Sequence, residues 1–426
     1  MSCLCIAVWL ILTVVAAIIV IAIPVFITLH HNEKTSNSSE NISKVNDVNQ
    51  EFSKADFINS LDVFGDNLFR ELYQGNPGKN IFFSPFSIQT CLTMTRMGAE
   101  GQTALEMDAS LNIYGKSMES VADKYHDILL KYENNSLLNV ANKMYVMQNY
   151  SVRDDYNRTV VERFGAAVEN IDFSQSQQAA YAINNWVENS TGGAIKNLIS
   201  STSLSSDTRI FLLSAIHFKG EWMTEFPREA TSQQDFFLNA PNRVIKLPMM
   251  YRKELSYYNI FPELNATALR LPYKNSDLSM LILLPNSFDG LTDLVEKLKH
   301  ISFETIANQT MDRTHVHIYL PKFKTEFEME LKDTLTKLGM NKMFNSGEFG
   351  HMLNSAEPLK ISNVIHKAFI EVDEKGTEAS AATGLSITTR DGGGIQSLIF
   401  KADHPFYYTI ISSDNIRLFE GTFIGL

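Results

Sequence analysis

The chain has 426 residues but only three cysteines, too few for a disulfide framework. Cys3 and Cys5 lie at the extreme N-terminus, and Cys91 lies inside an apolar stretch. A domain stapled by disulfides needs an even set of cysteines spread through the fold. The fold must therefore be held by its core, which a hydrophobic content of 44% can supply.

The sequence also lacks a basic face and the common catalytic motifs. Lys and Arg number 37 against 48 Asp and Glu, a formal net charge of −11, and no dense basic run occurs. This balance argues against a nucleic-acid partner, because phosphate binding needs concentrated positive charge. No G-x-S-x-G, H-E-x-x-H or paired-cysteine motif is present, so the sequence does not indicate an enzyme.

No cofactor or metal site is predicted either. His315 and His317 would share one face of a strand, as a pair of metal ligands could, but no third ligand lies near them in the sequence. We therefore interpret both as structural histidines. The triplet 392–394 is glycine, but it lacks the Lys-Ser/Thr continuation of a phosphate loop.

The N-terminal region differs from the rest of the chain. Residues 6–29 carry no charge and are long enough to span a bilayer, longer than the apolar part of most cleaved signal peptides. They predict a signal anchor at 1–29, and a cleaved signal peptide is the alternative. Residues 30–52 are polar and predict a stalk or linker. No second linker follows, so residues 53–426 are expected to form one domain.

Sequons for N-glycosylation are frequent, and together they favour a lumenal or extracellular domain. We therefore expect an extracellular protein, either anchored to the membrane through 6–29 or secreted. The sequons begin at Asn37, Asn41, Asn134, Asn149, Asn157, Asn189, Asn265 and Asn308.

Periodicity predicts helices early in the domain and strands later. Phe57, Leu61, Phe64, Leu68 and Leu72 recur every three or four residues, and Asn-Pro-Gly at 76–78 ends the run. Helices are also predicted at 86–98, 117–131 and 177–190. Strands are predicted at 210–218, 266–273, 278–285 and 314–323, followed by a C-terminal hairpin. This order indicates an α+β domain.

One segment near the C-terminus has the pattern of a strand but is followed by loop chemistry. From Thr377 to Thr389 every second residue is small or apolar, and the residues between them are polar or tiny. Such alternation is typical of a half-buried strand. No proline or charge interrupts 379–389, so neighbours on both sides could pair with it. It is either an ordinary edge strand with a flexible exit or a strand that slides between existing strands.

Residues 371–383, EVDEKGTEASAAT, resemble the hinge region of the serpins. Further similar segments run through the chain in the family's order, and the resemblance covers approximately residues 53–426. It implies a metastable α+β fold with three β-sheets, eight to nine helices and an exposed reactive loop. The other matching segments are 80–88, 183–199, 212–222, 269–273, 320–323 and 404–406.

The resemblance implies inhibition of a serine protease. The protease would attack the loop and form its acyl-enzyme, and residues 376–389 would then insert into the main sheet. Small hinge residues favour this behaviour, because relatives that do not inhibit often carry proline or bulky, charged residues there. The alternative is a non-inhibitory relative that acts as a ligand carrier or a membrane-tethered binding ectodomain. The hinge set is Glu374, Gly376, Thr377, Glu378, Ala379, Ser380, Ala381, Ala382 and Thr383.

Alignment of the hinge places the reactive bond between Arg390 and Asp391. Arginine at this position implies a trypsin-like target, whose specificity pocket holds a buried aspartate. Asp391 is unusual after such a bond, and Gly392–Gly394 lengthen the exit, so the exact bond stays open. Arg390 as a simple solvated loop charge is the alternative. We expect a monomer whose partner is the protease.

A second set of residues matches positions that the family uses where its main sheet opens. These are Ser84, Ser87, Asn184 and His366. Ser214, however, stands where an asparagine usually bonds the histidine. Because a serine is shorter and has one donor hydrogen, we expect the pairing to be altered or water-mediated.

Overall fold

The computed structural model describes residues 50–133, 137–354, 359–377 and 398–425. The apolar segment 6–29 and most of the predicted loop, 378–397, therefore lie outside the described residues. Two compact units are distinguished: residues 1–51 with 115–117, and residues 52–114 with 118–426. In the smaller unit Gln50 forms a parallel bridge with Lys116. All elements below belong to the larger unit.

The helix predicted from Phe57 onward is α2 (Lys54–Gly75). It begins with a capping box in which Ser53 and Asp56 each accept a hydrogen bond from the other's backbone N–H. All five apolar residues of the predicted stripe are buried. The other described α-helices are α3 (Pro85–Met97), α4 (Gly101–Ser110), α5 (Met118–Glu133), α6 (Asp154–Phe164), α7 (Ser176–Ser190), α8 (Leu291–Lys297), α9 (Phe303–Gln309), α10 (Lys332–Lys337) and α11 (Lys342–Asn345). None of the described helices is long and apolar enough to cross a membrane.

The strands form two hydrogen-bonded sheets in the described residues. The first sheet has seven strands in the order β3 (Ala167–Ile171), β2 (Leu138–Met147), β4 (Ile210–Phe218), β12 (Ile361–Val372), β13 (Gly376–Thr377) and β5 (Gly220–Glu221), with β11 (Phe323–Glu330) also paired to β12. The second has nine strands in the order β1 (Ile81–Phe83), β16 (Arg417–Phe423), β15 (Phe406–Ile411), β9 (Ser279–Pro285), β8 (Ala266–Pro272), β7 (Val244–Phe261), β10 (Arg313–Pro321) and β14 (Leu398–Lys401), with β6 (Ser232–Phe237) paired to β7.

The long strand β7 explains why two sheets appear where three were expected. Its 18 residues pair with β6 and β10 over the first part and with β8 from Tyr257 to Phe261. The second and third expected sheets therefore share one strand and form a continuous ladder. The α+β class itself is confirmed by this architecture.

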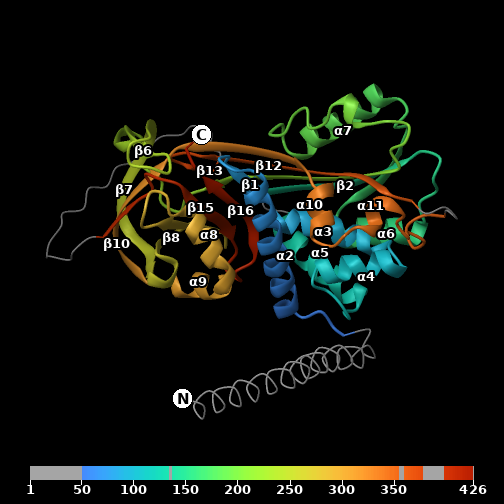
Figure 1. The fold of residues 1–426 in the computed structure, drawn as a ribbon, viewed down its shortest axis with the longest axis horizontal. Coiled ribbons are helices and arrows are strands. Elements are labelled where there is room, and N and C mark those ends of the chain that lie inside the picture. The colour runs from blue at the N-terminus through green and yellow to red at the C-terminus, as the bar shows by residue number, and fades with distance from the viewer. Residues whose placement is uncertain (1–49, 134–136, 355–358, 378–397, 426) are drawn as a thin grey trace, which may run out of the picture. The chain divides into compact units, whose positions relative to one another are not determined.

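The core fills two layers, one on each side of the seven-stranded sheet. On the inner side, α3 packs against β2 and β4 and also against β16 of the second sheet. On the outer side lies α7, apart from the other helices (Figure 1). Its Ile183 and Val187 pack on a cluster that includes Phe211 and Leu213 of β4. Because β4 is covered on both faces, all of its residues are buried.

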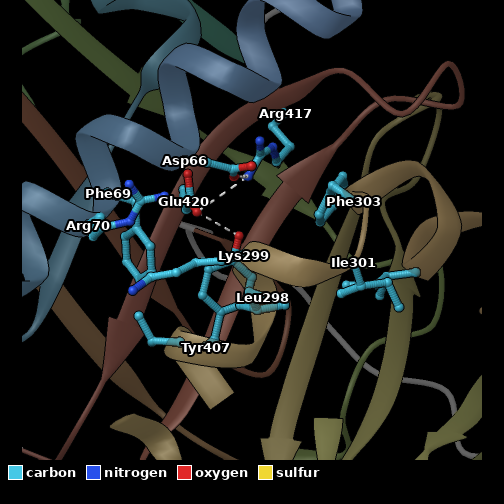
Figure 2. A pocket seen from close by; sticks show the side chains of 12 residues that line it. Asp66, Phe69, Arg70, Leu298, Lys299, Ile301, Phe303, Tyr407, Arg417 and Glu420 are labelled. Atoms are coloured by element: carbon cyan, nitrogen blue, oxygen red, sulfur yellow. Dashed lines mark hydrogen bonds and ion pairs between the residues drawn. The ribbon is translucent and has the colours of Figure 1, made fainter. Parts of the chain in front are cut away.

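A buried arginine ties α2 to β16. The Arg417 side chain is 2% exposed, and its guanidinium contacts Asp62 at 2.9 Å, Asp66 at 2.6 Å and Glu420 at 3.5 Å. Figure 2 shows Asp66, Glu420 and Arg417 pointing toward one another. The hydroxyl of Tyr407 donates to Glu420 at 2.9 Å. Burial raises the pKa of Glu420 to about 8. The cavity beside them has a volume of about 30 Å³, room for roughly one water and far below a small-molecule site.

Replacement of Arg417 by methionine should cost much of the domain's stability. Without the guanidinium, the buried Glu420 and the partly buried Asp62 would keep carboxyl groups with no cation, so we expect the free energy of unfolding to fall by about 3–5 kcal/mol. Urea unfolding measures this difference. The control is Lys54→Met, which removes an ion pair to Asp414 whose lysine side chain is 59% exposed and should cost less than about 1 kcal/mol. Equal effects of the two substitutions would contradict the structural role of Arg417.

Candidate functional site

The pairing of β4 with β12 differs from that of their other neighbours. Residues 210–217 of β4 run parallel to residues 361–369 of β12. On the far side of each, β2 and β11 pair antiparallel. One strand placed between β4 and β12 could therefore be antiparallel to both, and parallel pairing is the slightly weaker kind. An additional strand could therefore fit between β4 and β12. We call the boundary between these two strands the seam.

The hinge already occupies the end of this position. β13 pairs antiparallel with β12 through Thr377 and Val372, and with β5 through Gly376 and Glu221. β5 follows β4 after a single residue. Gly376 fits because it has no side chain: a Cβ there would lie 2.0 Å from the carbonyl oxygen of Gly220. The residues just before the predicted loop therefore form a short strand between β12 and β5. An inserted loop would extend this strand along the seam.

Charged and polar contacts fix the chain just before this strand. The Glu374 carboxylate accepts from Lys322 Nζ at 2.7 Å and from Thr231 Oγ1 at 2.8 Å. Burial acts to raise the pKa of Glu374, but these two hydrogen bonds outweigh it and hold the pKa below its ordinary value. Glu374 is therefore an ionised anchor at neutral pH.

Two aromatic residues complete the anchor. Trp222 is fully buried, donates from its ring nitrogen to the Asp373 carbonyl at 3.0 Å, and stacks on Tyr273 with ring centroids 4.8 Å apart. The Tyr273 hydroxyl lies 2.8 Å from Thr377 Oγ1. Thr377 therefore points toward the core side of the sheet, and the hinge is held by side chains from both sheets.

A buried histidine crosses the seam at its centre. The backbone N–H of Ser84 donates to His366 Nε2 at 3.2 Å, so Nε2 carries no proton and the proton is on Nδ1. Nδ1 then donates to Ser214 Oγ, 3.1 Å away on β4. Burial lowers the pKa of His366 to about 3, so the ring is neutral at pH 7. Ser214 reaches the histidine directly, although it is shorter than the asparagine usual in the family.

Through further hydrogen bonds, Ser214 connects His366 to α3 and β2. Ser87 Oγ donates its one hydrogen to Asn142 Oδ1 at 3.1 Å, so it must accept from Ser214 Oγ at 2.9 Å. The Asn142 amide returns a bond to the Ser87 carbonyl at 3.3 Å. One ordered chain of hydrogen bonds therefore links β12, β4, α3 and β2, and separation of β4 from β12 must break its His366–Ser214 bond.

The remaining predicted positions lie elsewhere. Asn184 is on α7, where its amide exchanges two 2.9 Å hydrogen bonds with the backbone of Ile199, so it does not join the His366 network. The hinge residues 378–383 and the bond between Arg390 and Asp391 lie outside the described residues. So do the sequons at Asn37, Asn41 and Asn134. The described sequon asparagines are all exposed: Asn149, Asn157, Asn189, Asn265 and Asn308.

Several residues of the site were not found from the sequence. Trp222, Tyr273 and Lys322 each lie at or near the end of a segment that carries the family resemblance, and their convergence on the hinge explains why those segments belong together. Asn142 had no such signal, because it lies outside the segments that carry the resemblance. In the described residues, no group of three or more ligands could hold a metal ion.

The neutral His366 makes stability depend on pH in a defined direction. Its pKa is about 3 in the fold against an ordinary 6.5, so below pH 6.5 the unfolded chain binds a proton that the folded chain does not. Stability from this group is complete above pH 6.5 and is lost as the pH falls toward 3, by about 2 kcal/mol at pH 5. Urea unfolding at pH 7 and pH 5 should show a smaller loss for His366→Gln. The same substitution at exposed His300 should keep the wild-type loss, and an unchanged loss in His366→Gln would contradict this assignment.

Comparison with known proteins agrees with this geometry. A family model described as Serpin (serine protease inhibitor) matches residues 59–425. Antichymotrypsin-2 of Bombyx mori is 38% identical over 369 residues, covering 86% of this chain and 97% of that protein. Antitrypsin of Bombyx mori is 38% identical over 372 residues, covering 86% and 93%. The solved structure of cleaved Serpin 42Da has a TM-score of 0.80 at 44% identity and covers 87% of this chain and 98% of its own. The resemblance seen in the motifs is confirmed: this chain belongs to the serpin family.

Proposed function

We propose that this serpin is a suicide-substrate inhibitor of a trypsin-like serine protease. After cleavage between Arg390 and Asp391, residues 376–389 enter the seam between β4 and β12 and trap the acyl-enzyme. The observation that carries the proposal is β13, which is already antiparallel to both neighbours at the end of that seam. The Glu374–Lys322 pair keeps that end of the segment attached while the rest moves.

The register of β13 can be continued along the seam. Thr377 is paired with Gly220 on one side and Val372 on the other. One-for-one continuation places Thr383 between Ser214 and His366, which already face each other in the closed sheet. The two sides of the seam therefore give the same position for the inserted residue, which supports a single register.

The alternating pattern of the loop suits this register. Positions of the same parity as Thr377 would face the core side, where Thr377 itself is fully buried. Leu385 would then lie between the buried Leu212 and Val364. Residues of the other parity, including Ala382 and Gly384, would face the outer side of the sheet, on which α7 lies. Both faces thus agree with the sequence.

The free energy of insertion is sufficient for the mechanism. Residues 376–389 at ~3.3 Å each give a strand of ~45 Å. About a dozen additional ladder hydrogen bonds, each worth ~0.5–1.5 kcal/mol net, contribute on the order of 10 kcal/mol. That energy, with burial of Leu385 and Ile387, could displace a bound protease from its productive geometry.

The choice of a trypsin-like target depends on Arg390 alone. The two silkworm relatives are named for chymotrypsin and for trypsin at the same identity, so overall similarity does not select the target. Arg390 is the only basic residue between Lys375 and Lys401. A buried aspartate in the protease pocket would bind its guanidinium.

A ligand carrier is the second candidate function. A hollow of about 420 Å³ between α5, α6 and β2, bordered by His126, Leu130 and Glu162, has the size of a small-molecule site. Binding and transport of a ligand would not require the strand pattern of residues 377–389. A carrier function would also leave the geometry of the hinge unexplained. Inhibition therefore accounts for more of the molecule.

Mixing the domain with trypsin tests the proposed inhibition. We expect a covalent complex that survives boiling in detergent, because insertion distorts the acyl-enzyme before it is hydrolysed. Arg390→Ala should abolish the complex with trypsin, since the specificity pocket loses its cation. Denaturing gel electrophoresis measures both results. Cleavage without complex, or cleavage that leaves the thermal midpoint unchanged, would count against insertion.

Neighbouring alanines provide a matched control for the register. Ala381→Glu places a carboxylate on the core side, opposite Ile216 and Ala368, and should convert the inhibitor into a substrate. Ala382→Glu places it on the outer side beside Lys367, and complex formation should largely survive. The reverse order of effects would refute the proposed register.

We also infer that the protein acts outside the cytosol, tethered by residues 6–29. The exposed sequon asparagines support glycosylation, and the apolar segment supports an anchor. Protein from its native cells should lose mass on treatment with an N-glycosidase and should keep its N-terminal segment by mass spectrometry. A mature chain that begins after residue 29 would replace the anchor with a cleaved signal, and an unglycosylated chain would argue for a cytosolic protein.

A further inference from the structure

The edge of the nine-stranded sheet presents an exposed surface that the insertion mechanism does not use. On β10 the side chains of Val316 and Ile318 are buried, so His315 and His317 point to the opposite, outer side. His317 lies between Lys253 of β7 and Ile399 of β14, and His315 lies beside Leu255. We call this outer surface the β10 face; its residues are Lys253, Leu255, Arg313, His315, His317 and Ile399.

The β10 face combines exposed aliphatic groups with cationic ones. Leu255 is 42% exposed and Ile399 is 65% exposed. Lys253 and Arg313 contribute positive charge, and none of the six residues is acidic, although the chain carries a net charge of −11. Arginine is enriched at protein–protein contact surfaces, and burial of the exposed aliphatic groups beside it would favour such a contact.

Part of this surface is held in place by its neighbours. The Arg313 guanidinium donates to the Leu255 carbonyl at 3.0 Å and lies 5.3 Å from the centre of the Tyr257 ring. His317 Nδ1 is 2.9 Å from the Tyr251 hydroxyl. Because these side chains are already ordered, a partner would lose less conformational entropy on binding them.

The face lies within reach of a protease at the reactive bond. β14 begins at Leu398, and a chain segment from Arg390 to Leu398 spans at most ~28 Å even when fully extended. A protein bound at Arg390 covers a surface patch of roughly 800 Å² when its contact is of ordinary size. The protease body is therefore the partner that the reactive bond brings to this surface.

We propose that the β10 face is a second contact surface for the trapped protease and selects proteases with acidic and apolar groups beside their active site. This inference rests on the proposed inhibitory function. Opposite charges across such a contact speed association and reject partners of like charge. The reactive residue then determines which protease specificity pocket can bind it. Among proteases with that pocket, the β10 face determines which one is inhibited fastest.

A pair of acidic substitutions on the face tests the proposal. Leu255→Glu with Ile399→Glu should lower the second-order rate constant of inhibition about tenfold for the fastest-inhibited member of a panel of trypsin-like proteases, and should weaken the dependence of that rate on salt. Progress curves measure the rate, and gels measure the fraction of inhibitor that ends in complex. That fraction should not change, because hinge and loop are untouched.

The matched control places the same charges on equally exposed residues elsewhere. Leu105 and Val161, on α4 and α6, are 48% and 51% exposed, and their double glutamate variant should keep the wild-type rate within about twofold. Complexes that form at the same rate in all three proteins would overturn the β10 face alone. Absence of any complex with the wild type would overturn the inhibitory function as well. Loss of heparin binding by the Leu255/Ile399 variant with an unchanged rate would assign the face to a polyanion and overturn the proposal.

Discussion

The parallel contact between β4 and β12 is the constraint on which the rest of the structure depends. Their other neighbours are antiparallel, so the sheet is closed but has room in its pattern for one more antiparallel strand. In the described part of the chain, β13 occupies the end of that position with two residues. Parallel pairing, the slightly weaker kind, joins β4 to β12, and under the proposed mechanism an inserted strand would replace it with two antiparallel ladders.

The His366 network and the contacts that hold the hinge would have opposite effects on insertion at this seam. The bond from His366 to Ser214 joins the two strands that the proposed insertion would separate, and its further links to Ser87 and Asn142 extend to α3 and β2. The contacts of Glu374 and Trp222 instead fix the segment that would stay attached during the proposed insertion. Under the proposed insertion, the first set of contacts would oppose strand separation and the second would position the entering strand.

Prediction from the sequence was most successful where a pattern is local. The α2 stripe, the buried run of β4 and the C-terminal hairpin follow from periodicity and turn residues, because each depends on neighbours a few positions apart. The convergence of Ser84, Ser87, Ser214 and His366 was accessible only through resemblance to a family. Lys322 and Glu374 are 52 positions apart, and no local pattern could have paired them.

The sequence by itself determined that residues 377–389 can form a strand, because alternation of small and larger residues is a property of the chain. It also determined that Arg390 is the charged residue at the end of that strand. Only the tertiary structure decided where such a strand would belong, since the direction of β4 relative to β12 arises from the path of the whole chain. It also brought Asn142 to Ser87 and set His315, His317 and Ile399 side by side, because strand register between distant segments is fixed by packing and not by local preference.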